Sequence, residues 1–190
     1  MSDLFLGSAE RPSPLAVVGR LVLLGLLVVW GWRLAALPMG PAITDSFLHL
    51  INLPFHEAGH ILFSPLGPFL TALGGSLMQL IVPAVCAGAL LLRTRDPFGA
   101  SVCTWWLGEN LLDVAPYIAD ARVLQLVLLG GRTGAEVEGH DWEYILASLG
   151  WLHLDRTLGA TAHRLGILIM AAALVWGGLV LLRQARRFRP

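Results

Sequence analysis

The stretch from Pro54 to Phe63 holds the residues of this 190-residue chain best suited to chemistry, because His56, Glu57 and His60 form the pattern His-Glu-x-x-His. On a helix, residues four apart project from one face, so both imidazoles can bind a single tetrahedral Zn²⁺. Glu57 lies on the adjacent flank, where its carboxylate can accept a proton from a water molecule that the metal activates. The pattern indicates a hydrolytic zinc site. The alternative interpretation is a set of buried polar residues that tie helices together.

A catalytic zinc site needs at least one further protein ligand and a position left open for water. Two other side chains are expected to support the ligands. His49 lies seven residues before His56, with Pro54 between them, and Glu109 lies in an apolar stretch, where it can accept a hydrogen bond from a zinc-binding imidazole. We expect Asp141 to cap a short helix that ends near residue 149. The downstream candidates for the third ligand are Asp113, Asp120, His140 and Asp141.

The composition is that of a membrane protein. Hydrophobic residues make up 56% of the chain and charged residues 14%, and the mean hydropathy is +0.69. Soluble domains are about 45–50% apolar and about 25% charged. The formal net charge of zero gives no indication of a nucleic-acid partner. The two cysteines fall in separate apolar stretches and suggest neither a disulfide framework nor a metal pair.

The apolar segments predict an all-α integral membrane protein, a bundle of four to five transmembrane helices with a short motif-bearing helix and interfacial helices. Pro54 is expected to begin a helix of about ten residues, preceded by a second short helical piece. This motif segment, 43–65, either crosses the membrane or enters it and returns. We expect a polar N-terminal tail at 1–14 and one membrane domain at 15–190, with an outer region at 115–156 and spans near 15–37, 69–92, 98–114 and 158–182.

The orientation follows from the basic ends of the spans. Four arginines after the last span place the C-terminus in the cytoplasm. The N-terminus lies outside if the motif segment spans and inside if that segment re-enters. The first apolar run is long and lacks a clear cleavage site, so it is expected to stay in place as an anchor. We expect an integral protein of a bacterial inner (plasma) membrane.

In this apolar setting, His56-Glu57-Ala58-Gly59-His60 resembles the metal motif of the site-2 proteases, which are intramembrane zinc metalloproteases. In that family a later helix carries an Asn-x-x-Pro-x-x-Pro-x-Asp-Gly element whose Asp is the third zinc ligand. The matching stretch here is 110–121, in which Asn110 and Pro116 keep the family spacing. Three positions depart from the element. Asp113 replaces the first proline, the later aspartate comes two residues late at Asp120, and Ala121 replaces the glycine.

The resemblance implies zinc bound by His56 and His60, with Glu57 as general base and acid. It favours Asp120 as the third ligand, with Asp113 as the alternative, and it implies that Asn110 positions the substrate backbone. The expected function is a membrane-embedded zinc metalloprotease. Its substrate would be a membrane or membrane-proximal protein, cut while the enzyme sits in the lipid bilayer.

Two other function classes stay open from the sequence. One is a non-catalytic membrane subunit or chaperone, bound to a membrane-complex partner, that keeps the motif as structure. The other is a metal-handling or cofactor-binding membrane protein that uses His56 and His60, with or without His49. Glu57 separates the protease from the metal-binding protein, because a pure binding site does not need a general base.

Overall fold

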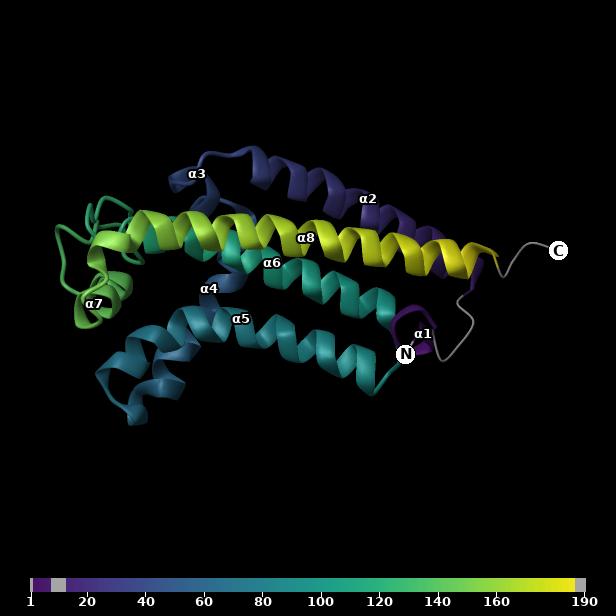
Figure 1. Ribbon diagram of the computed structural model, residues 1–190, viewed down its shortest axis with the longest axis horizontal. Coiled ribbons are helices and arrows are strands. Elements are labelled where there is room, and N and C mark those ends of the chain that lie inside the picture. The colour runs from purple at the N-terminus through teal and green to yellow at the C-terminus, as the bar shows by residue number, and fades with distance from the viewer. Residues whose placement is uncertain (1, 8–12, 187–190) are drawn as a thin grey trace. The chain divides into compact units, whose positions relative to one another are not determined.

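The computed structural model describes residues 2–7 and 13–186, and it is all-helical, as predicted (Figure 1). Helices account for 79% of the structure, and the described residues contain no strand, only an isolated bridge between Val127 and Thr133. Of the predicted polar tail, residues 1 and 8–12 lie outside the described residues. The elements are α1 Ser2–Leu6, α2 Pro14–Ala36, α3 Pro41–Thr44, α4 Phe47–Phe63, η1 Ser64–Leu66, α5 Pro68–Leu92, α6 Pro97–Ala119, α7 Asp141–Ser148, η2 Leu152–Leu154 and α8 Asp155–Arg186.

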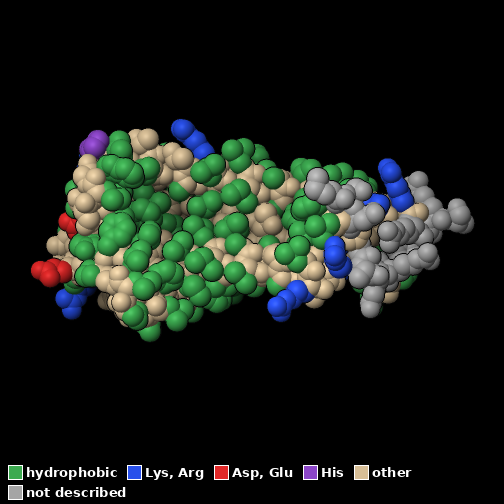
Figure 2. Space-filling model, turned by 60° about the horizontal axis from the view of Figure 1, so that its bottom comes forward, with side chains coloured by type: hydrophobic (Ala, Val, Ile, Leu, Met, Phe, Trp, Pro, Cys, Tyr) green, Lys and Arg blue, Asp and Glu red, His purple; other side chains and the backbone are tan. Residues whose placement is uncertain are grey.

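Three helical stretches among the described residues are long and apolar enough to cross a membrane: Pro14–Ala36, Pro68–Leu92 and Leu152–Arg186. They match the predicted spans at 15–37, 69–92 and 158–182. Only 11% of the most apolar window of the first and 22% of that of the second is buried inside the protein. Hydrophobic side chains accordingly are spread over much of the face drawn in Figure 2. This exposed apolar surface is what a lipid environment requires.

The predicted span at 98–114 is helical and forms part of α6, but it is not among the three membrane-crossing candidates. Glu109, Asn110 and Asp113 make it less apolar than the other long helices. All three side chains are buried. The described chain therefore has three such helices, against the four to five expected.

The motif lies on one continuous helix. Ser46 caps α4, with its hydroxyl accepting a hydrogen bond from the backbone N–H of His49 at 3.3 Å. The helix then runs through Pro54 to Phe63, so the prediction that Pro54 begins a separate short helix is wrong. The cap at Ser46 starts the helix two turns earlier, and Pro54 removes only one N–H donor at an exposed position. As a result, His49, His56 and His60 share one helix.

Contacts divide the chain into two compact units. The first comprises residues 1–36, 82–109 and 167–190, and the second comprises residues 37–81 and 110–166. In the first unit, Arg20 forms an ion pair with Asp96 at 3.2 Å and donates to Gln184 at 3.1 Å. All the residues of the candidate site described below belong to the second unit.

In the second unit, α4 and α5 meet at glycines. A side chain at Gly59 would collide with the backbone of Gly74, and one at Gly74 would collide with Phe63. This agrees with the small residues that α5 carries at this point, Gly74, Gly75 and Ser76. The close approach brings the motif face of α4 against α5. A separate core forms around Val114, Ala115, Ile118, Ala121, Leu146 and Ala162.

Candidate metal centre

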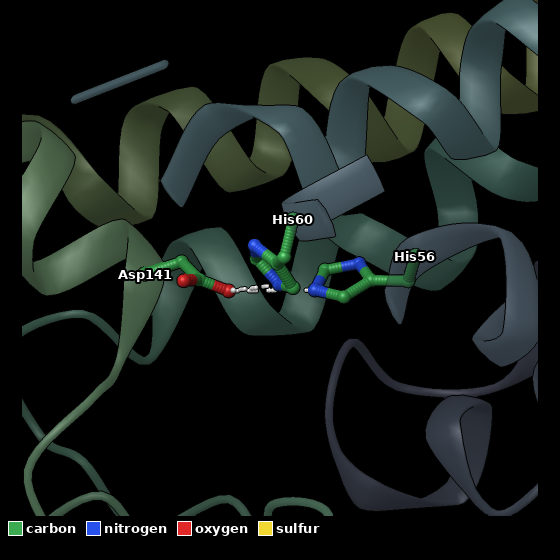
Figure 3. A group of neighbouring side chains, drawn as sticks. All are labelled: His56, His60 and Asp141. Carbon is green, nitrogen blue, oxygen red and sulfur yellow. Dashed lines mark hydrogen bonds and ion pairs between the residues drawn. The ribbon is translucent and has the colours of Figure 1, made fainter. Parts of the chain in front are cut away.

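The two motif histidines meet a carboxylate from α7 (Figure 3). Nε2 of His56 and Nε2 of His60 each lie 3.3 Å from the same oxygen, Oδ2 of Asp141. One ligand atom from each residue lies within 4.8 Å of the others. The spacing of the histidines on α4 accounts for two of these groups. The third comes from a residue far along the chain.

Hydrogen bonds on the far side of each ring orient the imidazoles. Nδ1 of His60 lies 2.8 Å from the backbone carbonyl of Thr71, and Nδ1 of His56 lies 2.6 Å from Oε1 of Gln79. A carbonyl oxygen only accepts, so Nδ1 of His60 carries a proton, and in the neutral ring that a metal requires its Nε2 presents a lone pair. Both Nε2 atoms therefore face the shared point as metal ligands do.

The donor set fits zinc. Two imidazole nitrogens and one carboxylate oxygen, with a fourth position open, is a common composition of catalytic zinc sites. In a tetrahedral site with metal–ligand distances of about 2.0–2.2 Å, neighbouring ligand atoms lie about 3.3–3.6 Å apart. The two 3.3 Å separations between Asp141 and the histidines match that spacing. His56, His60 and Asp141 would thus hold the ion.

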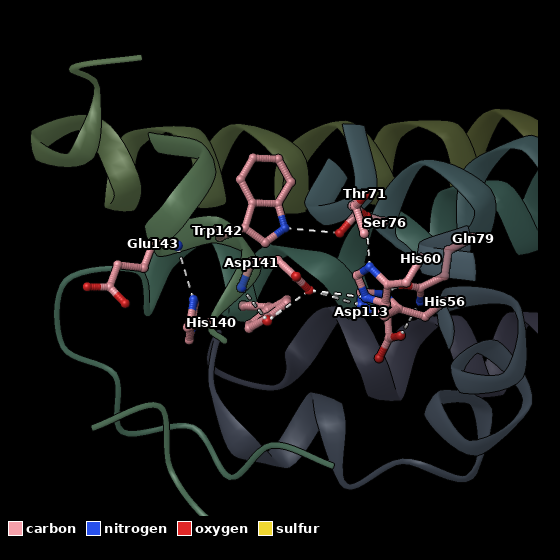
Figure 4. A network of polar contacts seen from close by, with 11 residues as sticks. His56, His60, Thr71, Ser76, Gln79, Asp113, His140, Asp141, Trp142 and Glu143 are labelled. Carbon is pink, nitrogen blue, oxygen red and sulfur yellow. Dashed lines mark hydrogen bonds and ion pairs between the residues drawn. The ribbon is translucent and has the colours of Figure 1, made fainter. Parts of the chain in front are cut away.

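Asp141 is held in place from two directions (Figure 4). The hydroxyl of Tyr117 donates to Oδ2 of Asp141 at 3.1 Å and accepts from its backbone N–H at 2.9 Å. Next to it, the indole Nε1 of Trp142 donates to the hydroxyl of Ser76 at 3.0 Å. These contacts fix the start of α7 against α6 and α5. They bring a distant carboxylate to the motif.

Burial by itself would raise the pKa of Asp141, but without a metal its contacts with the His56 and His60 rings outweigh that effect and lower the pKa to about 2. The carboxylate is therefore ionised at neutral pH, as a metal ligand must be. Asp141 does not cap α7 as expected. That role falls to His140, whose Nδ1 accepts the backbone N–H of Glu143 at 3.1 Å.

Gly75 closes one side of the site. A Cβ at this position would lie 2.6 Å from Nε2 of both His56 and His60, so the metal-facing nitrogens leave no room for a side chain. On another side lies a cavity of about 430 Å³. Its wall includes both histidines, Asp141, Glu57 and a run of aliphatic side chains from Leu126 to Leu129. Glu57 thus shares one cavity with the candidate ligands.

The two aspartates favoured from the sequence lie elsewhere in the unit. Asp120 accepts the backbone N–H groups of Gln125 and Leu126 at 3.0 and 2.9 Å, and its Oδ2 lies 3.5 Å from His140. Asp113 accepts hydrogen bonds from Asn52 on α4 and Gln79 on α5. Within the described chain, the group that could hold a metal contains Asp141 and neither of these residues.

The structure also places the expected supporting residues. His49 lies 2.8 Å from Asp113 through its Nδ1, and Oδ1 of the buried Asn110 lies 3.4 Å from Nε2 of Gln79. Both therefore belong to the polar network behind His56. Glu109 is buried too, but it belongs to the other compact unit.

The sequence suggested the contact between Gln79 and Asp113, but not the hydrogen bond of Gln79 to His56 or the roles of Tyr117 and Gly75, and Asp141 ranked below two other aspartates. Gly139, with a φ of 113°, turns the chain just before His140 and Asp141. A Gly-His-Asp-Trp sequence after a long loop was the available signal. It is a weak signal, because it also fits an ordinary helix start.

Comparison of the chain with protein-family models, with curated proteins and with solved structures found no match.

Proposed function

We propose that this chain is a membrane-embedded zinc metalloprotease, similar in its first motif to the site-2 proteases, that hydrolyses peptide bonds of membrane or membrane-proximal proteins. The observation that carries the proposal is the convergence of His56, His60 and Asp141, with Glu57 in the wall of the same cavity. Asp141 takes the place that the family gives to the aspartate of its second motif.

Bound zinc would polarise the scissile carbonyl and make water a better nucleophile near neutral pH. Glu57 then accepts the proton of the attacking water and passes it to the leaving amine. A metal-storage site would not need this carboxylate beside the ligands. Its position in the cavity therefore favours hydrolysis over simple metal binding.

The cavity suits a short stretch of extended, apolar peptide. Leu53 and Val137 add further aliphatic side chains to its wall. A helical substrate hides its carbonyls in hydrogen bonds, so it must unwind locally before cleavage. A volume of about 430 Å³ is within the range of pockets that hold small ligands or a few side chains.

We further propose that α6 is a fourth crossing and that α4 enters the membrane without adding a clear apolar span. Glu109, Asn110 and Asp113 are buried, which allows a helix with polar residues to lie within the bilayer. Arg183 and Arg186 end α8, and two further arginines, at 187 and 189, fall outside the described residues. This basic end supports a cytoplasmic C-terminus in a bacterial plasma membrane.

The test compares the zinc-loaded wild type with Glu57→Gln in proteoliposomes that contain a panel of single-span membrane proteins, with products identified by mass spectrometry. We expect cleavage by the wild type, loss of it by about 10²–10⁴-fold in Glu57→Gln, and unchanged zinc content. Glu136→Gln is the control, since it alters an exposed carboxylate of the same unit. Equal cleavage by Glu57→Gln, or an intact panel with the zinc-loaded wild type, contradicts the proposal.

A further inference from the structure

We propose that Asp113 and Gln79 act together as positioning residues for His56, so that a buried carboxylate on α6 controls the orientation of a metal ligand on α4. The inference rests on the metal site of the proposed function and adds residues to it. Figure 4 shows Gln79 and Asp113 beside His56 in the polar network.

The orientation of the Gln79 amide follows from its two neighbours. Its Nε2 lies 3.0 Å from Oδ2 of Asp113, and this carboxylate oxygen is the acceptor of the hydrogen bond. The NH₂ group must therefore face Asp113. This leaves Oε1, at 2.6 Å, as the acceptor for Nδ1 of His56.

This arrangement selects one tautomer of His56. With Nδ1 donating to Gln79, the proton of a neutral ring is on Nδ1 and the lone pair is on Nε2, the atom that faces Asp141 and His60. If the amide of Gln79 were reversed, its NH₂ would face Nδ1 and favour the opposite tautomer. Asp113 prevents the reversal.

Asp113 is itself firmly held. Its Oδ1 lies 2.8 Å from Nδ1 of His49, and its Oδ2 accepts from Nδ2 of Asn52 at 3.3 Å as well as from Gln79. Asp113 and Gln79 are each only 3% exposed. A buried carboxylate is costly unless it is hydrogen-bonded, and these contacts offset that cost. By fixing Asp113, the same contacts keep Oε1 of Gln79 directed at Nδ1 of His56.

A glutamine at position 79 suits the two contacts that this side chain makes, one with Asp113 and one with His56. An amide can both donate to a carboxylate and accept from an imidazole, which neither a carboxylate nor an aliphatic side chain can do. A glutamate would place two carboxylates against each other, and a leucine would leave Nδ1 of His56 without an acceptor. His60 needs no comparable arrangement, because the backbone carbonyl of Thr71 serves as its acceptor.

The test measures zinc affinity by chelator competition, and the visible spectrum of the Co²⁺-substituted protein, in detergent. The variants are Gln79→Leu, Gln79→Glu and the exchanged pair Gln79→Glu with Asp113→Asn. We expect Gln79→Leu and Gln79→Glu each to bind zinc about 10–100-fold more weakly, with altered Co²⁺ spectra. In the exchanged pair, the amide at position 113 donates to the carboxylate at position 79, which in turn accepts from Nδ1 of His56. The zinc affinity of the exchanged pair should therefore be about tenfold or more above that of Gln79→Glu.

Gln184→Leu is the matched control, because Gln184 is a buried glutamine bonded to a charged side chain in the other unit. It should leave zinc affinity and the spectrum unchanged. A wild type that binds no zinc overturns the metal site itself. A wild type that binds zinc, with Gln79→Leu equally tight or with the exchanged pair no better than Gln79→Glu, overturns only the role of Asp113 and Gln79. The exchanged pair decides the matter if Gln79→Leu does not fold.

Discussion

The hydroxyl of Tyr117 makes two hydrogen bonds to Asp141, donating to Oδ2 at 3.1 Å and accepting from the backbone N–H at 2.9 Å. The same Oδ2 faces both motif histidines. Since α7 begins at Asp141, this pair of bonds fixes α6 to the first residue of the helix that supplies the third ligand. The geometry of the candidate metal centre therefore depends on Tyr117.

Tyr117→Phe should weaken zinc binding by about tenfold, because supporting partners of a ligand typically contribute 10–100-fold in metal affinity. Chelator competition in detergent measures the change. Tyr144→Phe is the control, since Tyr144 lies on α7 and is 45% exposed. Equal zinc affinity in Tyr117→Phe and the wild type would show that the hydroxyl does not hold the ligand in place.

Gly75→Ala should abolish stoichiometric zinc binding. The new Cβ would lie 2.6 Å from both metal-facing nitrogens, and these belong to rings held in place by other bonds. Gly88→Ala lies on the same helix with nothing within 4 Å of the new Cβ, so it should bind zinc like the wild type. The metal content of the purified variants checks this. Normal zinc in Gly75→Ala would mean that the histidines do not converge beside this glycine.

Gly59→Ala should destabilise the protein. Its Cβ would meet the backbone of Gly74, so α4 and α5 would have to separate, at a cost of about 1–3 kcal/mol or more. Thermal unfolding in detergent measures the loss. Gly25→Ala is the matched helical control, with nothing within 4 Å of its Cβ, and alanine there should be neutral or mildly stabilising. If both variants melt alike, the two helices do not approach at Gly59.

Features that depend on residues near one another in the sequence, such as long helices and the face on which a side chain lies, could be predicted. Long apolar runs indicated α2, α5 and α8, and the four-residue spacing placed His56 and His60 on one helical face. The role of Pro54 was wrong, because a cap at Ser46 eight residues earlier decides where that helix begins.

The third ligand could not be predicted in the same way. Asp113, Asp120 and Asp141 are equally plausible by residue type, and whether Asp141 reaches the histidines depends on the path of the loop between α6 and α7. The hydrogen bonds from Tyr117 to Asp141 and from Trp142 to Ser76 hold the start of α7 next to the histidines. None of these long-range contacts leaves a periodic pattern in the sequence.

The zinc content of the purified wild type, Asp141→Asn and Asp120→Asn, measured side by side, distinguishes the candidate third ligands. We predict about one zinc ion per chain in the wild type and in Asp120→Asn, and loss of bound zinc in Asp141→Asn, where an amide replaces the carboxylate ligand. A wild type without zinc, or zinc retained in Asp141→Asn and lost in Asp120→Asn, would contradict the metal centre described here.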